Sequence, residues 1–180
     1  MRNIVYYLLL AIVFASCQSI KFDRYPGEAL QSIPEEFRGK YTHIMKNGSS
    51  FDTISVYISK DAYTIFNKKE TAIDFLDSTH VFSSYKNNYF LFVKNEGYWS
   101  GYSVKKKKSE LTVLNISVPN RGDNIRKVKV ISKYFADVKC VKTSSMLNMV
   151  ECTAKMDEKN LLKYIKKNKR NKMKLIQAKE

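Results

Sequence analysis

The chain has 180 residues and a hydrophobic content of 44%, which suits one folded domain and argues against a disordered chain. Its 32 Lys and Arg residues outnumber 17 Asp and Glu residues, and the formal charge of +15 would attract phospholipid headgroups, lipopolysaccharide or nucleic acid. A Lys- and Asn-rich composition can also reflect genomic base composition, so the charge alone identifies no partner.

The first seventeen residues have the pattern of a secretory signal peptide. A short positive start leads into an apolar run at 4–14, and two small residues, Ala15 and Ser16, then precede Cys17. The small residues before the cysteine resemble the lipobox of bacterial lipoproteins. That resemblance implies that residues 1–16 are removed and that Cys17 is lipidated.

The predicted lipid implies a location. Several acyl chains, at ~0.8 kcal/mol per buried methylene, would anchor the protein stably to its membrane. Gln18 follows the cysteine, which by resemblance to Gram-negative lipoproteins implies the outer membrane of the cell envelope. Nucleic acid is not expected as a partner there. Secretion without lipidation is one alternative, and an uncleaved anchor is another, although the apolar run is shorter than the about 20 residues that a spanning helix needs.

Residues 17–34 lack a hydrophobic period and are predicted to be the lipidated N-terminus and a tether. From 35 to 155 we expect an antiparallel β domain, because short β-rich runs alternate with turn residues. Ile54, Val56 and Ile58 show the alternation most clearly, since they share one face of a strand. The predicted strands are 39–46, 51–59, 62–67, 71–76, 79–85, 89–94, 98–104, 111–118 and 125–131.

The last third combines strands with a helix. Residues 132–142 fit a strand or a short helix, and 148–154 fit a strand. Asp157 is a good N-cap, and the helical spacing of the apolar residues after it predicts a helix at 158–168 within a terminal segment, 156–180, that ends in a basic tail. The fold class is therefore mainly β: an antiparallel meander, barrel or sandwich with a C-terminal helix.

The sequence at 34–41, Pro-Glu-Glu-Phe-Arg-Gly-Lys-Tyr, resembles the entry to a lipocalin-like barrel. In that family a Gly-x-Trp sequence opens the first strand, and here Tyr41 stands in the position of the Trp. The resemblance implies a barrel architecture and does not by itself imply a ligand.

With Cys17 lipidated, Cys140 and Cys152 remain as an even pair in an oxidising compartment. A disulfide between them would contribute about 3 kcal/mol in the chain-entropy model, and two buried thiols are the alternative. Neither cysteine has a C-x-x-C partner or a neighbouring His, so no zinc site is predicted.

Catalytic signatures are weak. His43 and His80 are the only histidines, and neither lies in a recognised nucleophile or metal motif. Asp74 and Asp77 could pair as glycoside hydrolysis requires, but their spacing is typical of two turn residues. We expect a protein without enzymatic activity and without a cofactor.

The aromatic residues favour binding. Tyr85, Tyr89, Tyr98 and Tyr102 lie on neighbouring predicted strands, and Tyr98 and Tyr102 share a face. Such a face could line a pocket for a small apolar or glycan ligand, with Tyr98 and Tyr102 pointing into a groove or barrel mouth. Cross-strand aromatic packing is the alternative.

Two basic clusters could contact an anionic surface. Residues 105–108 are four lysines in a predicted turn, where water can solvate all four charges and no partner is needed to account for them. The other cluster follows the predicted helix, and either contact with an anionic membrane or a solvated tail accounts for it. Its members are Lys166, Lys167, Lys169, Arg170, Lys172 and Lys174.

Three function classes follow. The first is a lipid-anchored domain that binds a ligand or a protein partner, and a cavity lined by tyrosines would favour it. The second is a structural lipoprotein that contacts anionic lipid or polysaccharide, and a filled core with a basic face would favour it. The third is an envelope enzyme, which a cleft holding His43 or His80 beside a carboxylate would favour.

Overall fold

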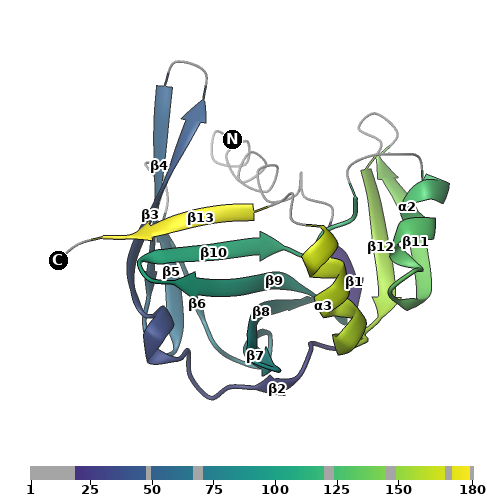
Figure 1. Cartoon of the computed structure of the whole chain (residues 1–180), viewed down its shortest axis with the longest axis horizontal. Coiled ribbons are helices and arrows are strands. Elements are labelled where there is room, and N and C mark those ends of the chain that lie inside the picture. The colour runs from purple at the N-terminus through teal and green to yellow at the C-terminus, as the bar shows by residue number, and fades with distance from the viewer. Residues whose placement is uncertain are drawn as a thin grey trace, which may run out of the picture.

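The computed structural model describes residues 19–47, 50–66, 71–119, 124–144, 149–168 and 172–178. These residues confirm the predicted fold class: an antiparallel, curled sheet forms a half-barrel, with helices beside it (Figure 1). Its strands are β1 (Ile20–Phe22), β2 (Glu28–Ala29), β3 (Gly39–Asn47), β4 (Ser50–Ile58), β5 (Ala62–Phe66), β6 (Thr71–Phe75), β7 (His80–Tyr85), β8 (Asn88–Asn95), β9 (Tyr98–Lys107), β10 (Glu110–Asn115), β11 (Ala136–Ser144), β12 (Met149–Lys155) and β13 (Lys172–Gln177). The helices are the 3-10 turn η1 (Glu35–Phe37), α2 (Asn124–Ile131) and α3 (Glu158–Lys167).

The described strands form one branched sheet. Its main path is β11-β12-β1-β9-β10-β13-β3-β4-β5-β6, while β8, β7 and β2 extend from the other side of β9. The pairings along this path are antiparallel, except that β1 runs parallel to β12. Because β6 and β7 do not pair, the curled sheet remains open between them and forms a half-barrel.

The predicted hairpins at the centre of the chain are present. Tyr85 pairs with Asn88, and Asn95 pairs with Tyr98, so each hairpin turns through two residues. Lys86 and Asn87 have φ angles of 48° and 58°, as a primed two-residue turn requires. Short local sequence signals were sufficient here.

The segment predicted as a tether is instead part of the fold in its described portion. Ile20 and Phe22 of β1 are fully buried, with 0% exposure, between β12 and β9. Ile33 lies in the loop before η1 and is also buried. A strand of three residues is too short to show a period, and its burial depends on strands more than 70 residues away in the sequence.

Residues 125–131, predicted as a strand, belong to helix α2. The alternation of Val and Lys in this segment fits a strand, but the segment is short enough to fit a helix as well. As a helix it buries Lys127 and Ile131, which lie four residues apart on one face and are 4% and 0% exposed. The open choice at 132–142 is resolved as strand β11.

Strand β13 replaces part of the predicted basic tail. It pairs with β10 over five residues and with β3 over two. It thereby connects strands β3–β6 to the rest of the sheet. Leu175 is buried on the concave side, whereas Lys172 and Lys174 are exposed. The strand was missed because its alternation of Lys with apolar residues is only six residues long.

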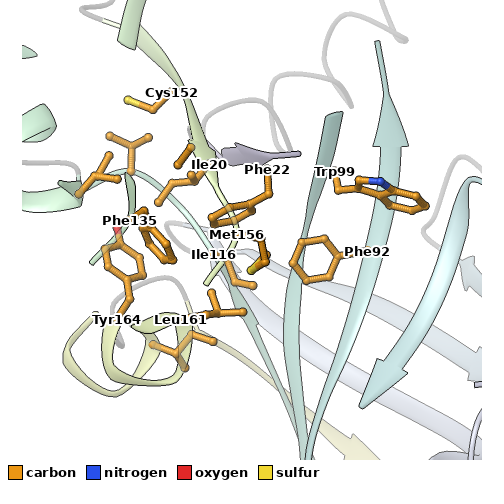
Figure 2. Close-up of a cluster of buried hydrophobic side chains, with 14 of the residues drawn as sticks. Ile20, Phe22, Phe92, Trp99, Ile116, Phe135, Cys152, Met156, Leu161 and Tyr164 are labelled. Atoms are coloured by element: carbon orange, nitrogen blue, oxygen red, sulfur yellow. The ribbon is translucent and has the colours of Figure 1, made fainter. Parts of the chain in front are cut away.

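The larger core cluster packs α3 and β11–β12 against the convex side of β8, β9 and β10 (Figure 2). Phe135 lies in its centre, with ring centroids 5.1 Å from Phe22 and 5.5 Å from Tyr164. The Tyr164 hydroxyl donates a 2.6 Å hydrogen bond to the Ser117 carbonyl. Asp157 caps α3 by accepting from the Asn160 amide at 2.8 Å, so the helix begins where the sequence predicts. This core leaves the concave side of the sheet free to form a site.

A second, smaller cluster packs η1 and the loop before it against β3, β7, β9, β10 and β13. Tyr41 is fully buried, and its hydroxyl donates to the Phe37 carbonyl of η1 at 2.9 Å. Lys106 donates to the Tyr41 hydroxyl and to the Gln177 side chain, both at 2.9 Å. The predicted turn at 105–108 is therefore corrected: β9 continues through Lys107, and Lys106 points inward to tie β9 to β3 and β13.

Candidate functional site

The concave side of the half-barrel contains an apolar cavity of about 440 Å³. Eight of the described strands contribute residues spaced two apart, because alternate side chains of a strand point to the same side. The apolar residues from these strands are Ile54, Val56, Ile58, Ile65, Ala72, Phe82, Leu91, Val93, Val104, Leu111, Val113, Met173 and Leu175. The cavity is therefore a consequence of the same alternation that predicts the strands.

The segment before β3 supplies the remaining apolar part of the wall. The Leu30 amide donates to the Phe82 carbonyl at 2.8 Å, and the Ile33 amide donates to the Lys60 carbonyl at 2.7 Å. These bonds fix the segment to β7 on one side and to the β4–β5 turn on the other. Ile33 and Phe37 consequently line the cavity.

Four lining residues carry polar groups: Tyr63, Asp74, His80 and Tyr102. Tyr63 lies directly opposite Asp74 in the β5–β6 pair, and its hydroxyl is hydrogen-bonded to the Asp74 carboxylate. Burial and this carboxylate raise the pKa of the Tyr63 phenol well above its usual range, so Tyr63 remains a neutral hydrogen-bond donor.

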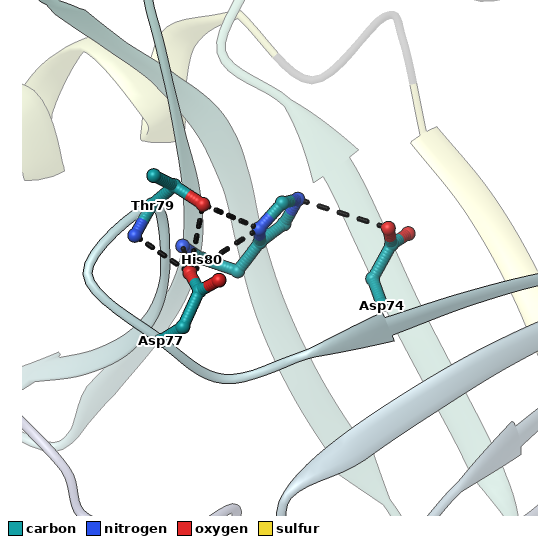
Figure 3. A network of polar contacts seen from close by, with 4 residues as sticks. All are labelled: Asp74, Asp77, Thr79 and His80. Atoms are coloured by element: carbon teal, nitrogen blue, oxygen red, sulfur yellow. Dashed lines mark hydrogen bonds and ion pairs between the residues drawn. The ribbon is translucent and has the colours of Figure 1, made fainter.

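His80 lies between two carboxylates (Figure 3). Its Nε2 is 3.8 Å from Asp74 Oδ1, and its Nδ1 is 3.5 Å from Asp77 Oδ1. The side chains of His80 and Asp74 are 23% and 36% exposed, so this polar cluster connects the apolar cavity with solvent. We call Tyr63, Asp74, His80 and Tyr102 the polar rim.

The turn between β6 and β7 holds His80 in place (Figure 3). Asp77 Oδ1 accepts from the Thr79 amide at 2.6 Å, the Thr79 hydroxyl at 2.7 Å and the His80 amide at 2.7 Å. The bonds from Thr79 and His80 lower the pKa of the Asp77 carboxyl to about 2. Asp77 is therefore a turn residue, as its spacing indicates, and it remains ionised beside the imidazole.

Of the four tyrosines predicted to bind a ligand, Tyr102 alone is among the described residues that line the cavity. Tyr102 lines the cavity, but Tyr98 is 41% exposed and is not among the lining residues. Both lie on one side of β9, but four residues span about 13 Å of strand, so β9 extends past the cavity. Tyr89 packs on Phe37 with centroids 4.8 Å apart, and Tyr85 packs against the larger core cluster. Tyr85 and Tyr89 therefore take part in aromatic and core packing, which was the alternative to a ligand-binding role.

The remaining predicted residues fall into three groups. Cys140 and Cys152 lie opposite each other on β11 and β12 and are joined by a disulfide. Lys166 and Lys167 are exposed at the end of α3, and Lys172 and Lys174 are exposed on β13. Cys17, Lys169 and Arg170 lie outside the described residues.

His43 lies apart from the cavity wall. Its Nδ1 is 2.7 Å from the Lys174 carbonyl oxygen, so the ring serves the β3–β13 contact. Within the described ranges, no group of three His, Cys, Asp or Glu residues is placed to hold a metal ion. Among those same residues, no helix has both the length and the apolar character needed to cross a membrane.

Comparisons with models of protein families, with curated proteins and with solved structures found no match to this chain. The site is therefore interpreted from its own geometry. In the sequence, Asp74 and His80 are candidates only for catalysis, and Tyr63 is not recognisable as a site residue. No local signal distinguishes Tyr63 from other strand tyrosines, because its role depends on its position opposite Asp74.

Proposed function

We propose that this protein is a lipid-anchored, non-catalytic binding protein of the cell envelope, and that its half-barrel takes up one small, mainly apolar molecule. The observation that supports this most directly is the apolar cavity of about 440 Å³. Protein interiors are close-packed and contain few voids larger than a water molecule, whereas ligand sites commonly measure ≈ 300–1,000 Å³. A ligand would restore the contacts that the wall residues lack.

The other parts of the proposal come from the sequence. The lipobox resemblance supports a lipid on Cys17 and a place on the outer membrane of a Gram-negative bacterium. The half-barrel is compatible with a lipocalin-like architecture, to which the entry sequence at 34–41 has a resemblance. A cavity lined partly by tyrosines also favours ligand binding over a purely structural role, for which a filled core is expected.

Binding can be tested with N-phenyl-1-naphthylamine, a neutral fluorophore that brightens in apolar surroundings. We expect saturable binding to the full chain at one site. Ile65→Trp should fill the cavity and weaken binding more than 10-fold, whereas Thr64→Trp, on the opposite face of the same strand, should leave it within about 2-fold. Equal effects of both variants, or no saturable binding, would contradict the proposal.

The polar rim also bears on the enzyme alternative, since His80 does lie beside carboxylates in a cavity. Nucleophilic catalysis needs a nucleophile next to the imidazole, and the Thr79 hydroxyl lies 3.0 Å from His80 Nδ1. Its one proton is directed to Asp77 at 2.7 Å, so it is not available to the imidazole. Thr79 is also absent from the cavity wall, which supports binding over catalysis.

A second candidate function uses the convex side of the sheet. Lys105 and Lys107 of β9 and Lys172 and Lys174 of β13 are exposed there, on the two strands that flank β10. The register places Lys105, Thr112 and Lys174 in one row. A bilayer containing anionic lipid attracts such residues with about 1 kcal/mol each. This row supports contact with an anionic membrane surface.

The test of the second candidate is vesicle binding by the full chain. Replacing these four lysines with Gln should reduce affinity for phosphatidylglycerol vesicles more than 10-fold and should leave binding to phosphatidylcholine unchanged. The matched control replaces four exposed lysines elsewhere, namely Lys133, Lys139, Lys142 and Lys155. Equal losses in both variants would indicate a general charge effect and would contradict a specific face.

A further inference from the structure

We propose that the ligand of the half-barrel carries a cationic amine at its polar end, and that Asp74 receives it within the polar rim. This inference rests on the proposed binding function and names the chemical class of the ligand. Its basis is the contrast between the charge of the chain and the charge of the cavity.

The chain is strongly basic, but the cavity is not. Of 49 charged residues, 32 are Lys or Arg, yet no Lys or Arg is found among the described residues that line the cavity. The inward-pointing Lys106 is not a lining residue, and its ammonium group is bonded to Tyr41 and Gln177. The charged lining group is the carboxylate of Asp74. A ligand with a carboxylate or phosphate end would place its charge beside Asp74 without a cation to balance it, which is costly in a poorly solvated site.

The neighbouring groups keep the rim acidic. Asp77 contributes a second carboxylate, and its Oδ1 lies 3.5 Å from His80 Nδ1. Together with Asp74, it gives the cluster a charge of about −2 when the imidazole is neutral and about −1 when it is protonated. In neither state does the cluster attract an anion.

Asp74 has acceptor capacity left for a ligand. An ionised carboxylate offers about four lone-pair positions. The Tyr63 hydroxyl occupies one of them, and His80 Nε2 is at 3.8 Å, beyond hydrogen-bond distance. An ammonium group can therefore bind to Asp74 while its apolar chain extends along the alternating Ile, Val and Leu residues of the wall.

The two tyrosines add a second means of recognition. Tyr63 and Tyr102 both line the cavity, and each presents an aromatic ring as well as a hydroxyl. Aromatic faces within about 6 Å attract ammonium ions and do not attract carboxylates. The Asp74 carboxylate, in a cavity that Tyr63 and Tyr102 also line, thus favours an amine over an alcohol of the same chain length.

The experiment compares three ligands with the same ten-carbon chain: decylammonium, decanol and decanoate. Each is titrated, below its micellar concentration, against the full chain loaded with N-phenyl-1-naphthylamine. We expect decylammonium to displace the probe at a concentration at least 10-fold lower than decanoate, which corresponds to about 1.4 kcal/mol. Decanol should fall between them. The net charge of +15 acts in the opposite direction, so nonspecific attraction cannot produce this order.

Asp74→Asn should bring the three midpoints within about 3-fold of one another. Glu110→Gln removes one carboxylate from the outer face, where Glu110 pairs with Lys174 at 2.8 Å, and should preserve the preference. Equal or tighter binding of decanoate to the unmodified chain overturns the inference without need of a variant and leaves the proposed function standing. Failure of all three compounds to displace the probe, or failure of the probe to bind, overturns the proposed function as well.

Discussion

The contacts of Asp74 in the structure could not be predicted from its position in the sequence. In the sequence it is an acid near the end of a strand, three residues before Asp77. In the fold, register places it opposite Tyr63, and the β6–β7 turn brings His80 Nε2 to 3.8 Å. Asp77 keeps the simpler role of a turn acceptor. The two carboxylates therefore differ because one side chain faces the cavity and the other faces its own backbone.

Tyr102 should matter more for binding than for folding. It is half-buried in the cavity wall, so Tyr102→Ala removes ligand contacts while exposing little core. We expect more than 10-fold weaker probe binding and a loss of unfolding free energy below the about 3–5 kcal/mol typical of a buried aromatic residue. Fluorescence titration and denaturant melts measure the two effects. Tyr98→Ala is the control and should change neither by much; a reversed order would assign Tyr102 to the core.

Asp77 should make stability depend on acid pH. Its folded pKa, about 2, lies below its usual value of 3.8, so its stabilising contribution is complete above about pH 4 and is lost as pH falls through about 2. Asp77→Asn keeps an acceptor oxygen but cannot titrate. The difference in melting temperature between the native chain and this variant should therefore shrink from pH 6 to pH 2.5. A difference that stays constant over this range would contradict the role of the ionised carboxylate.

At the scale of elements, β11 and β12 form a unit joined to the rest by β1 and by the larger core cluster. Cys152 is fully buried and Cys140 lies opposite it, on the neighbouring strand. A covalent link at this position holds together a hairpin that has a register shift on each side of the bridge.

Reduction of this disulfide should lower the stability of the oxidised protein. The bridge closes a short loop, with a sequence separation of 12, and the chain-entropy model assigns about 3 kcal/mol to it. Protein produced in an oxidising compartment should show a lower denaturation midpoint after addition of reductant. Cys140→Ser combined with Cys152→Ala should reproduce that midpoint without reductant. Free alkylation of both thiols in unfolded, non-reduced protein would contradict the bridge.

At the scale of the whole molecule, the proposed function joins a cavity to a membrane anchor. The anchor depends on Cys17, which precedes the first described residue, Ser19, by two positions. Because β1 begins at Ile20 and is buried, little chain separates the expected lipid from the folded domain. The proposed anchor would thus hold the domain close to the bilayer.

Cys17→Ser should abolish lipidation. In a Gram-negative host fed with radiolabelled palmitate, the native chain should carry label and run at the size of a processed protein. The variant should remain an unprocessed precursor without label, because the acceptor thiol is absent. Cys140→Ser, which retains Cys17, is the control and should be labelled normally. Label on the Cys17→Ser chain would contradict the lipoprotein interpretation.

The sequence by itself determined the local parts of this structure. Alternation located most strands, Asn and Gly marked the central hairpins, and Asp157 marked the start of α3, because each of these signals acts within a few residues. The same alternation placed Ile54, Val56 and Ile58 on one face, which became the cavity wall. Sequence reasoning failed where a segment was short: β1 has too few residues to show a period, and the α2 segment fits both a strand and a helix.

Only the tertiary structure decided which apolar faces of the strands are packed in a core and which line the cavity. Whether an apolar face becomes a packed core or the wall of a cavity depends on how far the sheet curls and on what covers each side, and both depend on contacts between distant segments. Helix α3 and β11–β12 cover the part of the convex side that carries Phe90 and Phe92, so these two side chains belong to a filled core. Their neighbours Leu91 and Val93 point to the uncovered concave side and line the cavity, because successive side chains of a strand alternate between its two sides.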